Sequence, residues 1–128
     1  MANQNIRKAA LNWFQSKYHI ENGEIFTSKF YTPQESWSKS RVWFFQIPLE
    51  VINSQPVKKI HLICENHLEG DPFVYLKTNS LFFLKNLKSF EVDQKEKIIR
   101  LYLSAEAVNM FTEVRGKGKI DFKAFCIT

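Results

Sequence analysis

Residues that break secondary structure or crosslink a chain are scarce in this sequence. Four glycines, four prolines and two cysteines occur among 128 residues, and no Pro/Gly-rich stretch marks a linker between domains. Two cysteines are too few for a disulfide framework. Because Cys64 and Cys126 each lie in an apolar run, we expect two buried free thiols and a reducing, cytoplasmic environment.

Long hydrophobic runs are also missing. Lysine or arginine interrupts every apolar stretch before it reaches the roughly 18 residues that cross a bilayer. Residues 1–8 lead into a mixed polar and apolar stretch that lacks the apolar run and the cleavage site of a signal peptide. The sequence therefore predicts a protein without a membrane segment.

The chain does contain enough apolar and aromatic residues for one packed core. Hydrophobic residues make up 45% of the sequence and aromatic residues 15%, so we expect a globular fold. A length of 128 residues suits a single domain over 1–128. Lysine and arginine number 18 against 13 acidic residues, and this formal net charge of +5 favours a polyanionic partner.

The periodicity of the sequence predicts an α+β fold. Apolar residues recur at helical spacing from 3 to about 18, and Gly23 ends this helix. Aromatic and β-branched residues then predict strands at 25–31, 41–47, 59–64, 73–77, 98–103 and 119–127, with 89–93 forming a hairpin with 98–103. Short helices are expected at 81–88 and 105–111, and a single turn at 48–54.

The connections between these segments are short. About eight residues join 59–64 to 73–77, which is too few for a parallel crossover. We therefore expect a largely antiparallel sheet, with a mixed sheet as the alternative, and the N-terminal helix covering one face of it.

The densest positive charge lies in the segment Arg115-Gly116-Lys117-Gly118-Lys119. Two glycines let the backbone turn and expose its amides, and exposed amides beside cations form a concave anion site. Such a loop would contact the phosphates of a nucleic acid. The alternative is a solvated turn whose lysines only keep the protein soluble.

A second polar segment, 36–41, holds Trp37 between serines and the cations Lys39 and Arg41. Trp37 has few apolar neighbours in sequence, so it could stack on a base while Lys39 and Arg41 contact phosphates. In the alternative interpretation, Trp37 folds back onto the core, because tryptophan is highly buried on average.

Motifs for catalysis or cofactor binding are weak. Two Asp-x-Lys triplets resemble part of a magnesium-dependent nuclease site, but chance alone predicts about as many. Asp121 and Lys123 would share a strand face, with Glu113 or Glu106 as a second acid. No phosphate-binding or dinucleotide-binding glycine motif occurs, and no histidine pair has metal-ligand spacing, so we expect no cofactor and no metal.

The leading hypothesis is a non-catalytic nucleic-acid-binding accessory domain, in a DNA-processing or defence system, that contacts the phosphate backbone through basic loops. The rival hypotheses are a protein interaction or assembly module, either a homodimer or a partner-binding domain, and a magnesium-dependent nuclease. The predicted nucleic-acid-binding residues are Trp37, Lys39, Arg41, Arg115, Lys117 and Lys119.

Overall fold

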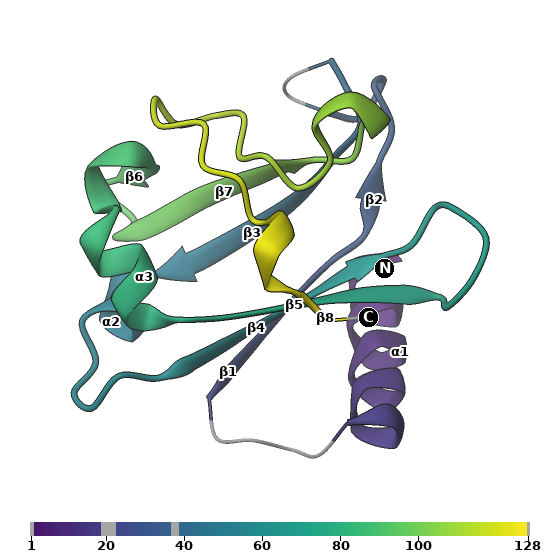
Figure 1. Cartoon of the computed structure of the whole chain (residues 1–128), viewed down its shortest axis with the longest axis horizontal. Helices are drawn as coiled ribbons and strands as arrows, with labels where there is room; N and C mark the ends of the chain where they lie inside the picture. The colour runs from purple at the N-terminus through teal and green to yellow at the C-terminus, as the bar shows by residue number, and fades with distance from the viewer. Residues whose placement is uncertain (1, 19–22, 37–38, 128) are drawn as a thin grey trace.

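The computed structural model describes residues 2–18, 23–36 and 39–127 (Figure 1). The helical elements are α1 (Ala2–Lys17), α2 (Leu49–Ile52), α3 (Ser80–Lys85) and the 3-10 turns η1 (Leu87–Ser89), η2 (Ala107–Asn109) and η3 (Lys123–Phe125). The strands are β1 (Glu24–Ser28), β2 (Phe30–Tyr31), β3 (Val42–Pro48), β4 (Lys59–Glu65), β5 (Phe73–Asn79), β6 (Glu91–Asp93), β7 (Ile98–Ser104) and β8 (Cys126–Ile127).

The strands form two four-stranded sheets rather than one. Their orders are β1-β4-β5-β8 and β2-β3-β7-β6. The pairing of β1 with β4 is parallel, and the other strand pairs are antiparallel. The predicted α+β class with largely antiparallel pairing is confirmed, and the mixed alternative applies to the first sheet.

The chain changes sheets between β1 and β2, where a single continuous strand was expected. The Ser28 hydroxyl accepts a hydrogen bond from the Phe44 amide (2.8 Å) and donates to the Lys29 carbonyl (2.7 Å). The Glu65 carboxylate accepts from the Phe30 amide at 2.8 Å. Side chains thus replace the backbone partners that a strand loses when it leaves its sheet.

The main core lies between the two sheets. Strands β3 and β7 contribute alternate residues to it, and β4 contributes most of the opposite side: Trp43, Phe45, Ile47, Ile99, Leu101, Leu103, Ile60, Leu62 and Cys64. Because side chains alternate along a strand, Phe44, Gln46, Arg100 and Tyr102 lie on the opposite face of the second sheet. We call this face the open sheet face.

Helix α1 covers the outer face of the first sheet, as predicted (Figure 1). Its buried residues Ala10 and Phe14 pack on Ile63 and Tyr75, and the Phe14 and Tyr75 rings lie 4.9 Å apart. His61 is fully buried beneath the helix, where Nδ1 lies 2.7 Å from the Tyr75 hydroxyl. Within 2–18, 23–36 and 39–127, we find no helix with both the length and the apolar character of a membrane span.

Three further predicted elements differ from the structure. Of the expected strand 119–127, only Cys126–Ile127 is a strand. The Asp121 carboxylate accepts a hydrogen bond from the Lys123 amide (2.8 Å), and this contact starts a 3-10 turn instead. The expected helix 105–111 shrinks to η2. The expected helix 81–88 ends at Lys85 and continues only as the turn η1, and the Asn79 side chain caps its start by accepting a hydrogen bond from the Phe82 amide.

The two cysteines are free thiols. Cys64 is fully buried, as predicted, and burial raises its pKa well above the ordinary value. Cys126 is only partly buried, because β8 is a two-residue edge strand at the end of the first sheet. Burial also raises the pKa of Cys126.

Candidate nucleic-acid interface

The basic segment 115–119 packs tightly against η1 and the start of β6. The Gly118 amide donates to the Ser89 carbonyl at 3.1 Å. At Gly116, a Cβ atom would lie only 2.1 Å from that same carbonyl oxygen, so a residue with a side chain does not fit. The glycines therefore serve close backbone packing at this point.

A buried carboxylate beneath this segment accepts hydrogen bonds from backbone amides of the segment and of β7. Glu113 is fully buried, and its carboxylate accepts hydrogen bonds from the amides of Gly116 (2.6 Å) and Tyr102 (2.9 Å). Burial raises the pKa of Glu113, while the amide hydrogen bonds and the charge of Lys119 act in the opposite direction. In the folded protein, the backbone of this loop therefore binds the carboxylate of Glu113.

The sheet edge explains why an acid is needed there. Strand β6 pairs with β7 as far as Arg100, and residues 112–114 take over beside β7 from Tyr102 onward. The Tyr102 amide falls at the junction of these two neighbours. Glu113 satisfies it, since an unpaired buried amide is unfavourable.

The three cations of the segment have different surroundings. The guanidinium of Arg115 lies 5.3 Å from the centre of the Tyr102 ring and 3.6 Å from the Glu91 carboxylate. Lys117 is exposed. The Lys119 ammonium donates to the Val114 carbonyl at 2.9 Å, so it closes the loop on itself.

The second predicted segment is only partly described. Trp37 lies outside the described residues. Lys39 is exposed and lines a cavity of about 390 Å³ together with Phe44 and Tyr102. Arg41 does not line this cavity, and its backbone amide donates a hydrogen bond to the Glu106 carboxylate (2.9 Å). The pKa of His67 is lowered mainly by burial and also by the positive charge of Arg41.

Aromatic side chains connect these two segments across the open sheet face. Phe44 and Tyr102 are cross-strand partners whose rings stack with centres 4.5 Å apart and planes 25° apart. Arg115 approaches this pair from one side, and Lys39 lines the cavity on the other. The structure thus brings Lys39 and Arg115 to the same aromatic pair.

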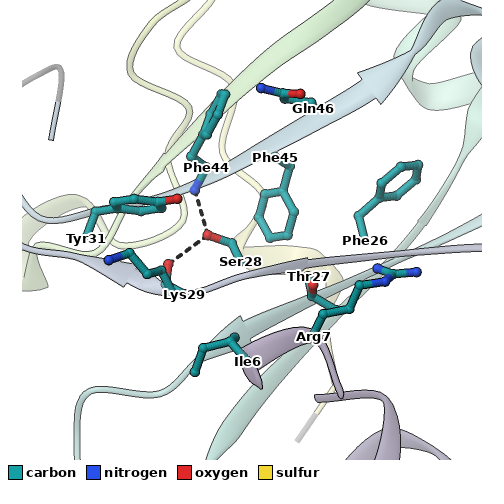
Figure 2. Close-up of a pocket in the computed structure, with 10 residues that line it drawn as sticks. All are labelled: Ile6, Arg7, Phe26, Thr27, Ser28, Lys29, Tyr31, Phe44, Phe45 and Gln46. Carbon is teal, nitrogen blue, oxygen red and sulfur yellow. Dashed lines mark hydrogen bonds between the residues drawn. The ribbon is translucent and has the colours of Figure 1, made fainter. Parts of the chain in front are cut away.

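A second cavity adjoins the first. The cavity lined by Lys39 is called the side cleft. Its neighbour, with a volume of about 400 Å³, is called the inter-sheet cleft. Both are lined by Tyr31 and Phe44. Figure 2 shows Phe44 and Phe45 pointing to opposite sides of β3 at the inter-sheet cleft, with Ser28 bonded to the Phe44 amide. The Lys29 ammonium lies 4.8 Å from the centre of the Tyr31 ring.

A third cavity, the edge groove of about 570 Å³, runs along β6 and the basic segment. Arg115, Lys117 and Lys88 line it together with Glu91. Lys88 adds a cation that sequence reasoning missed. Lys88 lies far from the basic segment in sequence, so no local pattern links the two. They come together only because Gly116 and Gly118 pack on Ser89, the neighbour of Lys88.

Positive charge dominates the three cavities. Their linings include six cations and two acids, a surplus of four: Arg7, Lys29, Lys39, Lys88, Arg115 and Lys117 against Glu35 and Glu91. Three cations of the face are held by carboxylates, in the pairs Lys29–Glu35 (2.7 Å), Arg100–Asp93 (2.8 Å) and Arg115–Glu91 (3.6 Å). The pair with Lys29, helped by hydrogen bonds from Thr32, lowers the pKa of Glu35 to about 2.

The structure does not bring the residues of the nuclease hypothesis together in one site. Asp121 and Lys123 do not share a strand face, because the chain turns into η3 between them. The two candidate second acids bind backbone amides instead: Glu113 is buried under the basic segment, and Glu106 accepts from Arg41. Among the described residues, no group of three His, Cys, Asp or Glu side chains is placed to hold a metal ion.

Comparison of the chain with known protein families, with curated protein sequences and with solved structures finds no match. The function is therefore inferred from the arrangement of the side chains. This arrangement consists of partly exposed aromatic rings in the middle of a sheet, with cations above and at both sides of them. Cations of this kind can neutralise phosphates, and the rings can contact planar apolar groups.

Proposed function

We propose that this protein binds nucleic acid without cleaving it, and that the open sheet face and its three cavities form the contact surface. The observation that carries the proposal is the meeting of two distant basic segments at one aromatic pair. Arg115 lies over Tyr102, and Lys39 lines the side cleft next to Phe44. A chain of phosphates could follow the cations from the edge groove to the inter-sheet cleft.

The ion pairs on the face limit how much of its charge is available. Arg100 and Arg115 each share their charge with a carboxylate at the sheet edge. Lys39, Lys88 and Lys117 make no ion pair with a residue that the structure describes. These three lysines are therefore the expected main phosphate contacts, and Arg115 packs over the Tyr102 ring.

Fluorescence polarisation with labelled oligonucleotides over a salt series tests this proposal. The logarithm of the binding constant should fall linearly with the logarithm of salt concentration, by about 0.7 to 0.9 for each phosphate contact. The double variant Lys39→Glu/Lys117→Glu should weaken binding at least tenfold and reduce the slope. The matched control Lys8→Glu/Lys123→Glu makes the same charge change at exposed positions that line none of the three cavities.

Three results would contradict the proposal. Equal losses in both double variants would mean that net charge, and not this face, attracts the oligonucleotide. Absent or salt-insensitive binding, together with a concentration-dependent oligomer in sedimentation, would favour the assembly module instead. Plasmid cleavage in the presence of magnesium would contradict the non-catalytic part.

A further inference from the structure

We propose that the open sheet face binds single-stranded nucleic acid, with one unpaired base inserted into the side cleft against Phe44. This inference rests on the proposed function, because it takes the binding of nucleic acid for granted and names the form of the strand.

One cation and two aromatic rings lie in a row across this face. Arg115 covers one side of the Tyr102 ring, and Phe44 stacks on Tyr102. Beside Phe44, strand β2 has not yet begun, because its pairing with β3 starts at Phe30 with Trp43. Phe44 therefore has no paired β2 residue opposite it, and the two clefts lie at this point, lined by both Phe44 and Tyr31.

The side cleft has the size and lining that a nucleobase needs. Its volume is about 390 Å³, at the lower end of the range for small-molecule sites. Three aromatic rings line it, those of Tyr31, Phe44 and Tyr102. Gln34, which is exposed, adds an amide that can both donate to and accept from a base edge.

Cations flank the position that such a base would take, and of these Lys39 is the expected phosphate contact. Lys39 lines the side cleft itself. Lys29 lies over Tyr31 and lines the inter-sheet cleft, and Arg115 lies on the far side of Tyr102. In a duplex, the base faces are stacked within the helix and cannot enter a concave cleft, so a duplex can use only the cations.

The test compares four ligands of equal length: a single-stranded DNA, its RNA counterpart, a hairpin duplex, and a single strand with abasic sites at successive positions. Stacking of one base contributes about 5- to 150-fold in affinity. We expect both single strands to bind at least fivefold more tightly than the duplex, and the abasic strand to lose a factor in this range.

Variants locate the effect on the protein. Phe44→Leu keeps an apolar side chain but removes the ring, and it should weaken binding of the base-containing strand while leaving the abasic strand unchanged. Tyr31→Leu should act in the same direction. Phe125→Leu is the matched control, since Phe125 is a partly buried phenylalanine of η3 that packs on Phe82 and Phe122 and lines none of the three cavities.

The outcomes separate the two proposals. Salt-dependent binding that is equally tight for the duplex or for the abasic strand would overturn the single-strand inference and leave the proposed function intact. The same conclusion would follow if Phe44→Leu and Tyr31→Leu both fold and bind like the wild type. If no oligonucleotide shows salt-dependent binding, the proposed function itself fails. The abasic comparison uses the unaltered protein, so it does not depend on whether a variant folds.

Discussion

Replacing Glu113 by alanine should destabilise the protein strongly, although glutamate is usually a surface residue. Its side chain is fully buried and accepts hydrogen bonds from the Tyr102 amide at 2.9 Å and the Gly116 amide at 2.6 Å. Alanine would leave both amides without their acceptor inside the protein. The basic segment would also lose the contact that joins it to β7.

The expected size of the effect follows from two opposing contributions. Leaving one buried amide unsatisfied costs about 1–3 kcal/mol, so the two amides together correspond to about 2–6 kcal/mol. Removing a buried carboxylate relieves part of its desolvation penalty, which is the same penalty that raises the pKa of Glu113. We therefore expect a net loss of about 2–4 kcal/mol in the free energy of unfolding.

Urea denaturation followed by tryptophan fluorescence measures this loss. With a slope of about 2 kcal/mol per M, the midpoint should fall by about 1–2 M. Glu91→Ala is the matched control, because Glu91 is half-exposed and its pair with Arg115 is 3.6 Å long, so the change should stay below about 1 kcal/mol. A loss below about 0.5 kcal/mol in Glu113→Ala would refute the assignment of Glu113 as the acceptor that holds the loop.

The same residue predicts a dependence on pH. Because the folded pKa of Glu113 lies above the ordinary 4.5, the native state holds more protons than the unfolded state between these two values. The contribution of Glu113 to stability is therefore greatest below pH 4.5 and falls as the pH rises through the folded pKa. The difference in unfolding free energy between wild type and Glu113→Gln should shrink from pH 4 to pH 7, and a growing difference would contradict this sign.

Three further predictions concern single contacts. Gly116→Ala should lower the melting temperature clearly in a thermal scan, because its Cβ would lie 2.1 Å from a backbone oxygen, whereas Lys117→Ala should not. Ser28→Ala should lower the free energy of unfolding by about 1–3 kcal/mol in urea, since the Phe44 amide loses its acceptor; Ser28→Thr should retain part of it. Cys64 should react with a thiol reagent only after unfolding, because it is fully buried, and rapid labelling of the native protein at Cys64 would contradict its position.

Local patterns predicted most of the secondary structure because those patterns report local physical preferences. The helical spacing of Ala10 and Phe14 reflects the one face that α1 buries. The Asn79 side chain caps α3 through a contact only three residues away. The predicted strand 119–127 was wrong because an equally local contact, from Asp121 to Lys123, favours a turn there.

The division into two sheets was outside the reach of these patterns. A run such as 24–31 has strand propensity throughout, whichever sheet each part joins. The break at Lys29 depends on two hydrogen bonds to other strands. Ser28 accepts from the Phe44 amide of β3, and Glu65 of β4 accepts from the Phe30 amide. Such partners lie far along the chain, so no local window contains them.

The candidate interface divides in the same way. The sequence by itself determined the surplus of positive charge and the positions of its basic segments, because charge is a property of composition. Only the tertiary structure decided that Lys39 and Arg115 meet at one aromatic pair, since this depends on the register that sets Phe44 beside Tyr102. It also decided that Glu113 binds the Tyr102 and Gly116 amides, because the pairing of β6 with β7 reaches only Arg100 and leaves the next buried amide of β7 without a backbone partner.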